Sequence, residues 1–307
     1  STTTAYGVIS LIICIIAPLF LCFTIFGVRE NREYNDAPPV SLKKIWNSIT
    51  GNDQLLWISL IFLLQQIGNG LIVGSTYIYF DFGYNGGLFS LFTIVGMSVT
   101  AFLMIFYPAI SRKLPRKRFM GILLVISMVG YALMLIAGLS MPAEMPKFWV
   151  VTVGYMLSNF GQYGFYLVMM ISIINTVEYN EYLSGDRDEA IIASLRPFLT
   201  KMSSALIVLI TNVAYMIFGV TKYTNRISDL ENECARNLIT EQDKISSIGS
   251  VINGIEPGKT LALLICMVVI PCVLMLLSYI LYKKHYKLDE DEYERICGEL
   301  DARKQKA

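Results

Sequence analysis

The sequence is poor in charged residues and contains a single histidine, His285. Only 16% of its 307 residues are charged, whereas soluble domains carry about 25%. The six cysteines form no CxxC pair and no cluster with histidine, so neither a disulfide framework nor a metal site is predicted. The net charge of +1 gives no sign of a nucleic-acid partner. The apolar runs described next contain no paired carboxylates, which makes an enzyme the least favoured class.

The sequence is instead rich in long apolar runs. Hydrophobic residues make up 54% of the chain, and its mean hydropathy is +0.54. A membrane-spanning helix needs about 20 apolar residues. No basic stretch precedes the first run, so a signal peptide is not predicted. We predict an all-α membrane protein with about seven transmembrane helices. The seven runs are 6–26, 55–80, 88–111, 119–139, 148–176, 191–220 and 260–282.

Lysine and arginine alternate between the loops. They are frequent in the loops after the first and third runs and in the tail, but absent from the loop DFGYNGG after the second run. Because positive loops stay in the cytoplasm, we predict an extracytoplasmic N-terminal end and a cytoplasmic C-terminus. The predicted location is the plasma membrane, which for a bacterium is the inner membrane. The chain lacks an initiator methionine, and we expect it to be part of a longer protein.

Two polar segments carry helical patterns of their own. In the loop before the last run, Ser228 with Glu231 and Thr240 with Asp243 predict two helix starts. We therefore expect two short amphipathic helices there, which either connect the spans or cover the outer mouth of a transport path. The tail predicts a cytosolic surface helix with Asp289 as its N-cap.

The second and fifth apolar runs carry amide and tyrosine side chains among closely spaced glycines. Unsatisfied polar groups are costly in a bilayer, and small residues allow close packing or a local break of the helix. Amides bind hydroxyl groups and aromatic rings stack on sugars, so we predict a polar cavity for a neutral, polyhydroxylated ligand. Hydrogen bonding between helices is the alternative for any single residue. The candidates are Gln65, Asn69, Tyr77, Asn159, Gln162 and Tyr166.

The sixth run contains two basic residues, Arg196 and Lys201, and the seven runs contain no acidic residue away from their ends. Lys201 lies about ten residues, or ~15 Å, beyond the start of its run. A charged group at that depth costs at least ~2.5 kcal/mol. We predict that Lys201 is either deprotonated or hydrated in a cavity, or that its acidic partner lies on helices outside this chain.

The loop between the fifth and sixth runs is dense in charge and contains Glu178, Glu181 and Arg187. These residues either solvate a turn or pair with the basic loop that contains Arg112 and Arg116. In the second case they would form a cytoplasmic gate whose ion pairs separate during transport. The sequence leaves both interpretations open.

The same stretch carries a family resemblance. NTVEYNEYLSGDRDEA followed by RPFLTK resembles the loop and the eleventh helix of the glycoside–pentoside–hexuronide:cation symporters, a branch of the major facilitator superfamily. FGVRENREY, GNDQLLWI, YPAISRKLPRKRFM and YKLDEDEYERICGEL are similar to that family as well. The resemblance therefore covers nearly the whole chain. Asn175 departs from the aspartate that is usual at its position in the family.

The resemblance implies helix 6 and the C-terminal six-helix half of a twelve-helix transporter. Residues 1–26 would be the sixth helix, 27–54 a cytoplasmic linker and 55–282 the transport half. The loop 221–259 would lie within that half, and 283–307 would form the tail helix. The implied activity is symport of a glycoside or oligosaccharide with Na⁺ or H⁺ by alternating access. The implied partners are the sugar, the lipid bilayer and the remaining N-terminal half, and this chain alone would bind no cofactor.

The resemblance also assigns roles to three residues. Lys201 would help to bind substrate beside the cation site, Arg196 would face the same cavity, and Tyr166 would be a stacking aromatic. A lysolipid or other small-solute carrier of the same superfamily is an alternative. A seven-helix receptor is less favoured, because the third run ends without an Asp-Arg-Tyr triplet and the last lacks Asn-Pro-x-x-Tyr.

Overall fold

The computed structural model describes residues 2–27, 41–71, 73–111 and 113–305. Within these ranges the chain forms helices and no strand, as the predicted all-α class requires. The helices are α1 (Thr2–Gly27), α2 (Leu42–Thr50), α3 (Asp53–Asn69), α4 (Val73–Phe82), α5 (Gly86–Ser111), α6 (Arg116–Ser140), α7 (Met145–Ile174), α8 (Thr176–Ser184), α9 (Glu189–Ile217), α10 (Thr221–Ala235), α11 (Glu241–Asn253), α12 (Pro257–His285) and α13 (Glu290–Lys304).

Six helical segments within the described ranges are long and apolar enough to cross a membrane. The predicted span 55–80 is not among them, because it is divided into α3 and α4. The α3 helix ends where the Gly70 N–H donates to the Gln66 carbonyl at 3.0 Å. The local break predicted from the glycines of this run is therefore confirmed, and neither half is long enough to span a bilayer alone.

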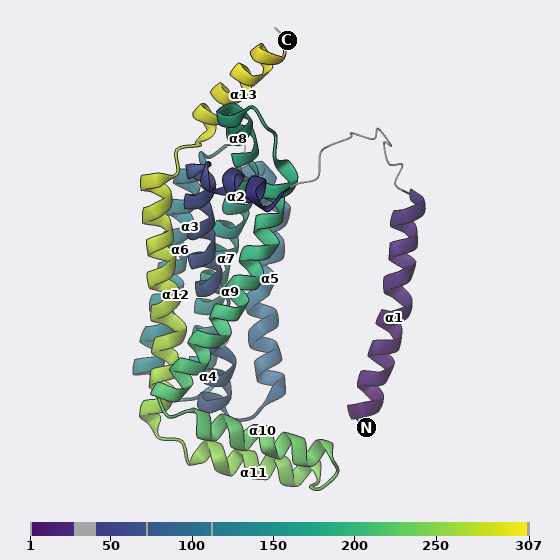
Figure 1. The fold of residues 1–307 in the computed structure, drawn as a ribbon. Coiled ribbons are helices and arrows are strands. Elements are labelled where there is room, and N and C mark those ends of the chain that lie inside the picture. The colour runs from purple at the N-terminus through teal and green to yellow at the C-terminus, as the bar shows by residue number, and fades with distance from the viewer. Residues whose placement is uncertain (1, 28–40, 72, 112, 306–307) are drawn as a thin grey trace. The chain divides into compact units, whose positions relative to one another are not determined.

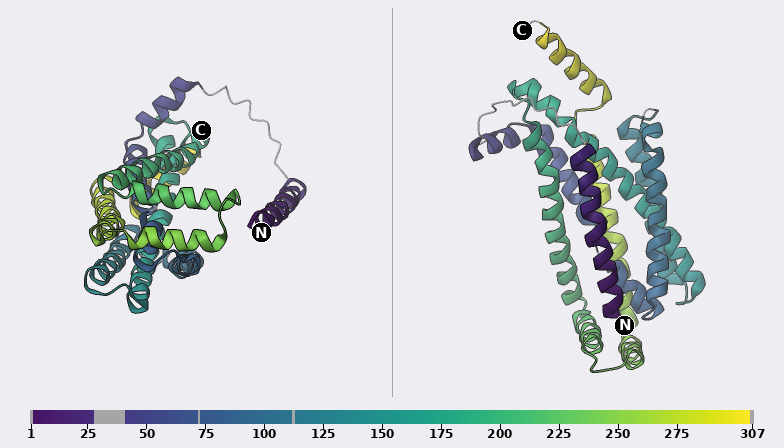
Figure 2. Two further views of the ribbon diagram at one scale, coloured as in Figure 1. Left: turned by 90° about the horizontal axis from the view of Figure 1, so that it is seen from below. Right: turned by 90° about the vertical axis from the view of Figure 1, so that its right-hand side faces the viewer.

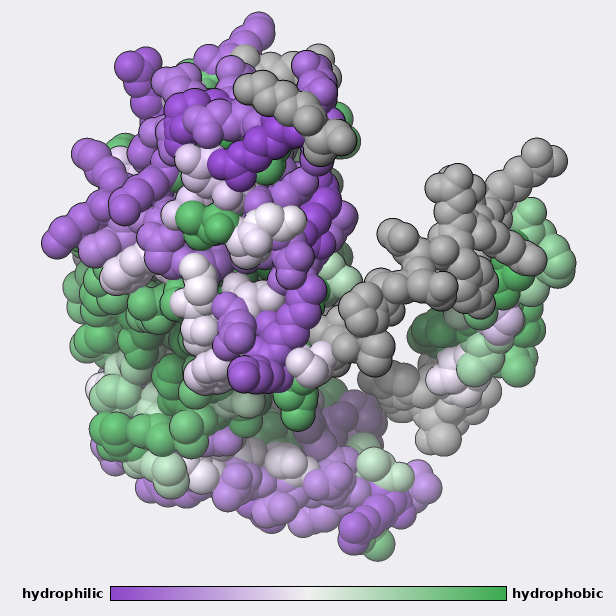
Figure 3. Space-filling model, turned by 45° about the horizontal axis from the view of Figure 1, so that its top comes forward, coloured by the Kyte–Doolittle hydropathy of each residue, from purple (hydrophilic) through white to green (hydrophobic). Residues whose placement is uncertain are grey.

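The chain separates into two compact units, Ser1–Ser41 and Leu42–Ala307. In the second unit the long helices α3, α5, α6, α7, α9 and α12 run side by side (Figures 1 and 2). The helices α10 and α11 cross one end of this bundle, and α2, α8 and α13 lie at the other. On the face shown in Figure 3, apolar side chains form a band between two hydrophilic ends of the bundle, as expected for a protein that crosses a bilayer.

The helices α6 and α7 approach each other closely. A Cβ atom at Gly161 would lie 1.8 Å from the Ser127 Oγ and 2.6 Å from the Leu123 carbonyl oxygen. Small residues let helix backbones approach in this way. The Ser127 hydroxyl uses the proximity to donate to the Ser158 carbonyl at 3.2 Å. This contact fixes the two helices that carry most of the polar residues described below.

Gly161→Ala is expected to lower the thermal unfolding midpoint of the purified protein in detergent, since overpacking costs roughly 1–3 kcal/mol. Gly298→Ala, in α13, is the matched control because no atom lies within 4 Å of its added Cβ. The control should raise the midpoint slightly, as alanine is the better helix former. Equal midpoints for the two variants would contradict the close α6–α7 contact.

The polar helices α10, α11 and α13 were predicted with one error. Thr240 and Asp243 form the predicted capping box of α11, and Asp289 caps α13 by accepting from the Glu292 N–H at 3.2 Å. The predicted start at Ser228 is wrong, because α10 already begins at Thr221. Gly219, with a positive φ of 63°, turns the chain so sharply after α9 that the next helix follows at once.

Candidate functional site

Two of the predicted glutamines meet inside the bundle and form the centre of a polar cluster. The Gln65 Nε2 of α3 donates to the Gln162 carbonyl oxygen of α7 at 2.9 Å and to its Oε1 at 3.1 Å. The Gln162 Nε2 in turn donates to the Tyr131 hydroxyl of α6 at 2.9 Å. All three side chains are buried. A hydrogen-bonded chain thus links three helices in an otherwise apolar interior.

A cavity of about 230 Å³ adjoins this cluster. Asn69 at the end of α3 and Asn159 and Gln162 of α7 line it, together with the rings of Phe92 and Tyr155. These two rings stack with centroids 4.4 Å apart. The break between α3 and α4 also borders the cavity, through Gly68 and Gly74. The cavity therefore combines amide groups and aromatic rings, although the predicted Gln65, Tyr77 and Tyr166 do not line it.

Two amide oxygens near the cavity have no hydrogen-bond partner among the described residues. These are the Oε1 atoms of Gln65 and Gln66. An amide oxygen accepts two hydrogen bonds, and buried polar atoms without a partner are uncommon in native proteins. A hydroxyl donor from a small ligand or from water would satisfy these atoms.

Tyr166 and Arg196 form a second group, between α7 and α9. The Arg196 Nη2 donates to the Tyr166 hydroxyl at 2.7 Å, and its guanidinium carbon lies 5.9 Å from the centre of the ring. The ring of Phe62 of α3 lies beside the Tyr166 ring, with the two ring centroids 5.9 Å apart. The arginine is exposed, so Tyr166 holds a charged group at the surface of the bundle.

Lys201 is not enclosed by the Leu42–Ala307 unit. Its side chain is exposed on α9, and none of the described residues pairs with it. Lys201 points away from the side of α9 that carries Leu199 and Ile207 into the core. An acidic partner for it on helices outside this chain stays a prediction.

Tyr77 lies apart from the cavity and belongs to a buried ion pair. Its hydroxyl donates to the Asp81 Oδ2 at 3.0 Å, and the Lys147 Nζ lies 2.8 Å from the same oxygen. The Lys147 and Asp81 side chains are only 6% and 10% exposed. Sequence reasoning treated both as loop residues at the ends of two different spans. Their opposite charges at the same end of the bundle were the signal that could have paired them.

The charged loop after α8 pairs within itself and with the tail. Arg187 contacts Glu178 at 3.0 Å, Glu181 at 3.3 Å and Glu189 at 3.3 Å. Glu181 also accepts from Lys304 of α13 at 2.8 Å. These ion pairs close the loop on itself and attach the end of the tail helix to it.

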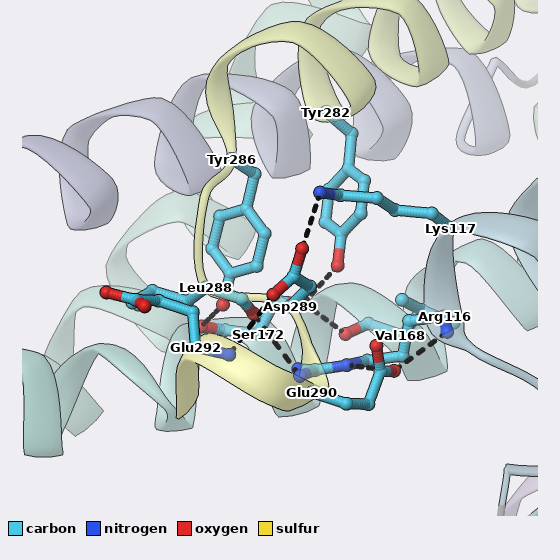
Figure 4. A network of polar contacts seen from close by, with 10 residues as sticks. All are labelled: Arg116, Lys117, Val168, Ser172, Tyr282, Tyr286, Leu288, Asp289, Glu290 and Glu292. Atoms are coloured by element: carbon cyan, nitrogen blue, oxygen red, sulfur yellow. Dashed lines mark hydrogen bonds and ion pairs between the residues drawn. The ribbon is translucent and has the colours of Figure 1, made fainter. Parts of the chain in front are cut away.

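Arg116 has a different partner from the one predicted. Its Nε lies 2.9 Å from the Glu290 Oε1 and its Nη2 lies 3.2 Å from the Leu288 carbonyl, beside the Lys117–Asp289 pair (Figure 4). Burial favours a higher pKa for Glu290, but hydrogen bonds from Arg116 outweigh it and lower the pKa. The predicted ion pairing of Arg116 with the acidic loop is thus not formed among the described residues, and Arg112 lies outside them.

This rearrangement follows from where the tail helix begins. The N-terminal turn of α13 places Asp289 and Glu290 beside the first turn of α6. These carboxylates are nearer to Arg116 than those of Glu178 and Glu181, which Arg187 already occupies. A gate made by these residues stays a prediction for another conformation.

The sequence matches the family described as MFS/sugar transport protein over residues 1–290. The chain belongs to this family. The match agrees with the predicted resemblance to the glycoside–pentoside–hexuronide:cation symporters of the major facilitator superfamily. Together with its apolar helices it makes the chain a multi-pass membrane protein of the bacterial cell membrane.

Several relatives of this MFS chain are named as sugar carriers. A raffinose carrier protein of Pediococcus pentosaceus is 26% identical over 300 residues, which cover 96% of this chain and 41% of the relative. A lactose permease of Leuconostoc lactis is 28% identical over 204 residues, which cover 64% of this chain and 30% of the relative. A lactose permease of Lactobacillus helveticus is 21% identical over 305 residues, which cover 97% of this chain and 42% of the relative. The chain spans about two fifths or less of the length of these relatives, whose names describe transporters and not enzymes.

In this MFS chain the structure brings together Asn69, Asn159 and Gln162 around one cavity, and Gln65 is hydrogen-bonded to Gln162 behind its wall. Sequence reasoning missed Tyr131, which lies in the middle of an apolar run. A tyrosine hydroxyl in mid-membrane needs a partner, and that requirement could have identified it.

Proposed function

We propose that this chain is part of a secondary transporter that moves a glycoside or an oligosaccharide together with Na⁺ or H⁺ by alternating access. The observation that carries the proposal is the pair of buried amides, Gln65 and Gln162, beside a cavity with aromatic walls. The names of the relatives, a raffinose carrier and two lactose permeases, support the same substrate class. The family match favours a carrier over a receptor.

The chemistry of the cavity suits a neutral sugar. Asn69, Asn159 and Gln162 line the cavity and would bind hydroxyl groups of the sugar. Asn159 and Gln162 carry both donors and acceptors, so they could bind hydroxyl groups in either sense. The stacked rings of Phe92 and Tyr155 offer an apolar wall for a face of the sugar ring.

The coupling cation needs groups that the described spans do not provide. We propose that the remaining helices of the full-length protein supply a carboxylate for Na⁺ or H⁺ and lie opposite the exposed face of α9. Arg196 and Lys201 would then border the substrate from this chain. By the distribution of lysine and arginine, the end that carries α2, α8 and α13 faces the cytoplasm, as does the C-terminus.

Gln162→Leu tests the proposed site. In the full-length gene product that contains this chain, it should reduce uptake of labelled raffinose or lactose by about tenfold, the effect of losing one hydrogen bond of roughly 1 kcal/mol or slightly more. Uptake into cells or proteoliposomes measures the effect, with membrane abundance determined in parallel. Gln242→Leu, at an exposed position of α11, is the control.

Two outcomes separate the site from the function. Full uptake by Gln162→Leu at normal abundance would remove this residue from the substrate site while leaving the transport proposal intact. Absence of uptake by the wild-type protein for every glycoside and oligosaccharide tested, with or without a Na⁺ or H⁺ gradient, would contradict the proposed function itself.

A further inference from the structure

A groove of about 650 Å³ runs along the outside of the bundle between α6 and α12. Its apolar part is lined by residues of α6 that include Ile122 and Val125, which are 48% and 63% exposed. Gly121 keeps the groove open towards α12, because a Cβ there would lie 3.1 Å from the Tyr279 hydroxyl. The groove therefore offers an apolar channel within the hydrophobic band of the bundle.

One end of the groove is basic. Lys117, Arg118 and Lys283 line it, and its lining contains no acidic residue. Lys117 is partly neutralised by Asp289 at 3.1 Å (Figure 4). Arg118 and Lys283 are exposed and make no ion pair with any residue that the structure describes. Two uncompensated cations thus lie at the hydrophilic end of an apolar groove.

This groove is separate from the proposed sugar site. Ile122 in the groove and Tyr131 at the cavity are both on α6 but lie on opposite sides of it. They are nine residues apart, which is two and a half turns of a helix with about 3.6 residues per turn. The groove opens outward, whereas Tyr131 is buried. The groove is therefore not a part of the transport cavity.

We propose that the groove binds one anionic phospholipid. Its phosphate lies between Arg118 and Lys283, and one acyl chain lies along Ile122 and Val125. A soluble anion would make no use of the apolar channel, and a zwitterionic lipid would leave the two cations with a headgroup of no net charge. Basic pockets between transmembrane helices on the cytoplasmic side are suited to anionic headgroups, and the sequence places this end of the bundle in the cytoplasm.

Native mass spectrometry of the purified protein, titrated with phosphatidylglycerol or phosphatidylcholine of the same chain length, tests the proposal. The wild-type protein should bind phosphatidylglycerol about 30-fold more tightly than phosphatidylcholine, since two basic residues face the headgroup. The double variant Arg118→Gln/Lys283→Gln should weaken that binding about 30-fold and remove the preference, since each basic residue near the headgroup contributes about fivefold. Equal binding of the two lipids by the wild-type protein would overturn the proposal.

Matched controls distinguish a site from general attraction to a basic surface. Lys284→Gln/Lys287→Gln removes the same charge at the same end of α12, outside the groove lining, and should keep the preference for phosphatidylglycerol. An equal loss in both double variants would overturn the proposal in favour of general electrostatic attraction.

A second pair of variants leaves the charge unchanged. Val125→Trp should fill the groove and weaken phosphatidylglycerol binding, whereas Val129→Trp, one turn along α6 and outside the lining, should not. Unaltered binding in Val125→Trp would overturn the groove as the location.

Discussion

Lys201→Ala is expected to reduce cation-stimulated sugar uptake by the full-length protein about 100-fold, since hydrogen bonds to charged groups contribute roughly 1.5–3 kcal/mol. Membrane insertion and thermal stability should stay close to those of the wild type. The side chain is exposed on this chain and packs into none of its cores. Its removal therefore leaves no cavity and no unpaired partner within the Leu42–Ala307 unit.

The reason to assign Lys201 to the transport path lies in the exposed surface of α9. Ser204, Val208 and Asn212 are exposed on the same side of this helix as Lys201, so this side carries both polar and apolar groups. A charged lysine that faces lipid at mid-helix costs at least ~2.5 kcal/mol. The side of α9 that carries Lys201 must therefore face water or further protein.

Uptake of labelled sugar, with and without a Na⁺ or H⁺ gradient, measures the effect of the substitution. Lys201→Arg should retain part of the activity because it keeps the positive charge. It should lose the rest because the guanidinium group differs in shape from the ammonium group. Lys284→Ala, an exposed lysine at the end of α12, is the matched control and should transport normally. If Lys201→Ala took up sugar at the wild-type rate and at equal abundance, Lys201 would have no role in transport.

The sequence predicted those features of the fold that depend on local pattern. Apolar runs give the long helices, and the glycines at Gly68, Gly70 and Gly74 indicated the break between α3 and α4. The capping pattern at Thr240 and the N-cap at Asp289 located the starts of α11 and α13. Each of these signals involves residues within one or two turns of each other, so a single sequence contains all the information needed.

The features that the sequence could not predict depend on which distant residues compete for the same partner. Arg116 had acidic candidates in two segments, and only the docked tail shows that Glu290 is the nearer one. The polar cluster was predicted as a set of amides, but Tyr131 joins it from a third helix whose rotation the sequence does not fix. Likewise, the side of α9 on which Lys201 is exposed does not follow from the sequence alone.

Asp81→Ala is expected to produce the largest loss of stability in this chain. It leaves the Lys147 ammonium buried, at 6% exposure, without its carboxylate. Breaking a buried ion pair by removing one partner costs about 3–5 kcal/mol. The midpoint of thermal unfolding in detergent should therefore fall markedly. Glu233→Ala, which breaks the exposed Arg226–Glu233 pair of α10, is the matched control and should leave the midpoint nearly unchanged.

The double variant Asp81→Leu/Lys147→Met distinguishes a lost charge pair from lost packing. Replacement of both partners by apolar side chains is often neutral, so the double variant should recover most of the stability. A triple variant that adds Tyr77→Phe also removes the hydroxyl that would lose its acceptor. Equal destabilisation by the single and double variants would contradict this account. The pair matters because α4 is only ten residues long and follows the break beside the cavity. A short helix at such a break depends on its packing against α12 and α5 to keep its position. The Asp81–Lys147 pair is its ionic link to α7.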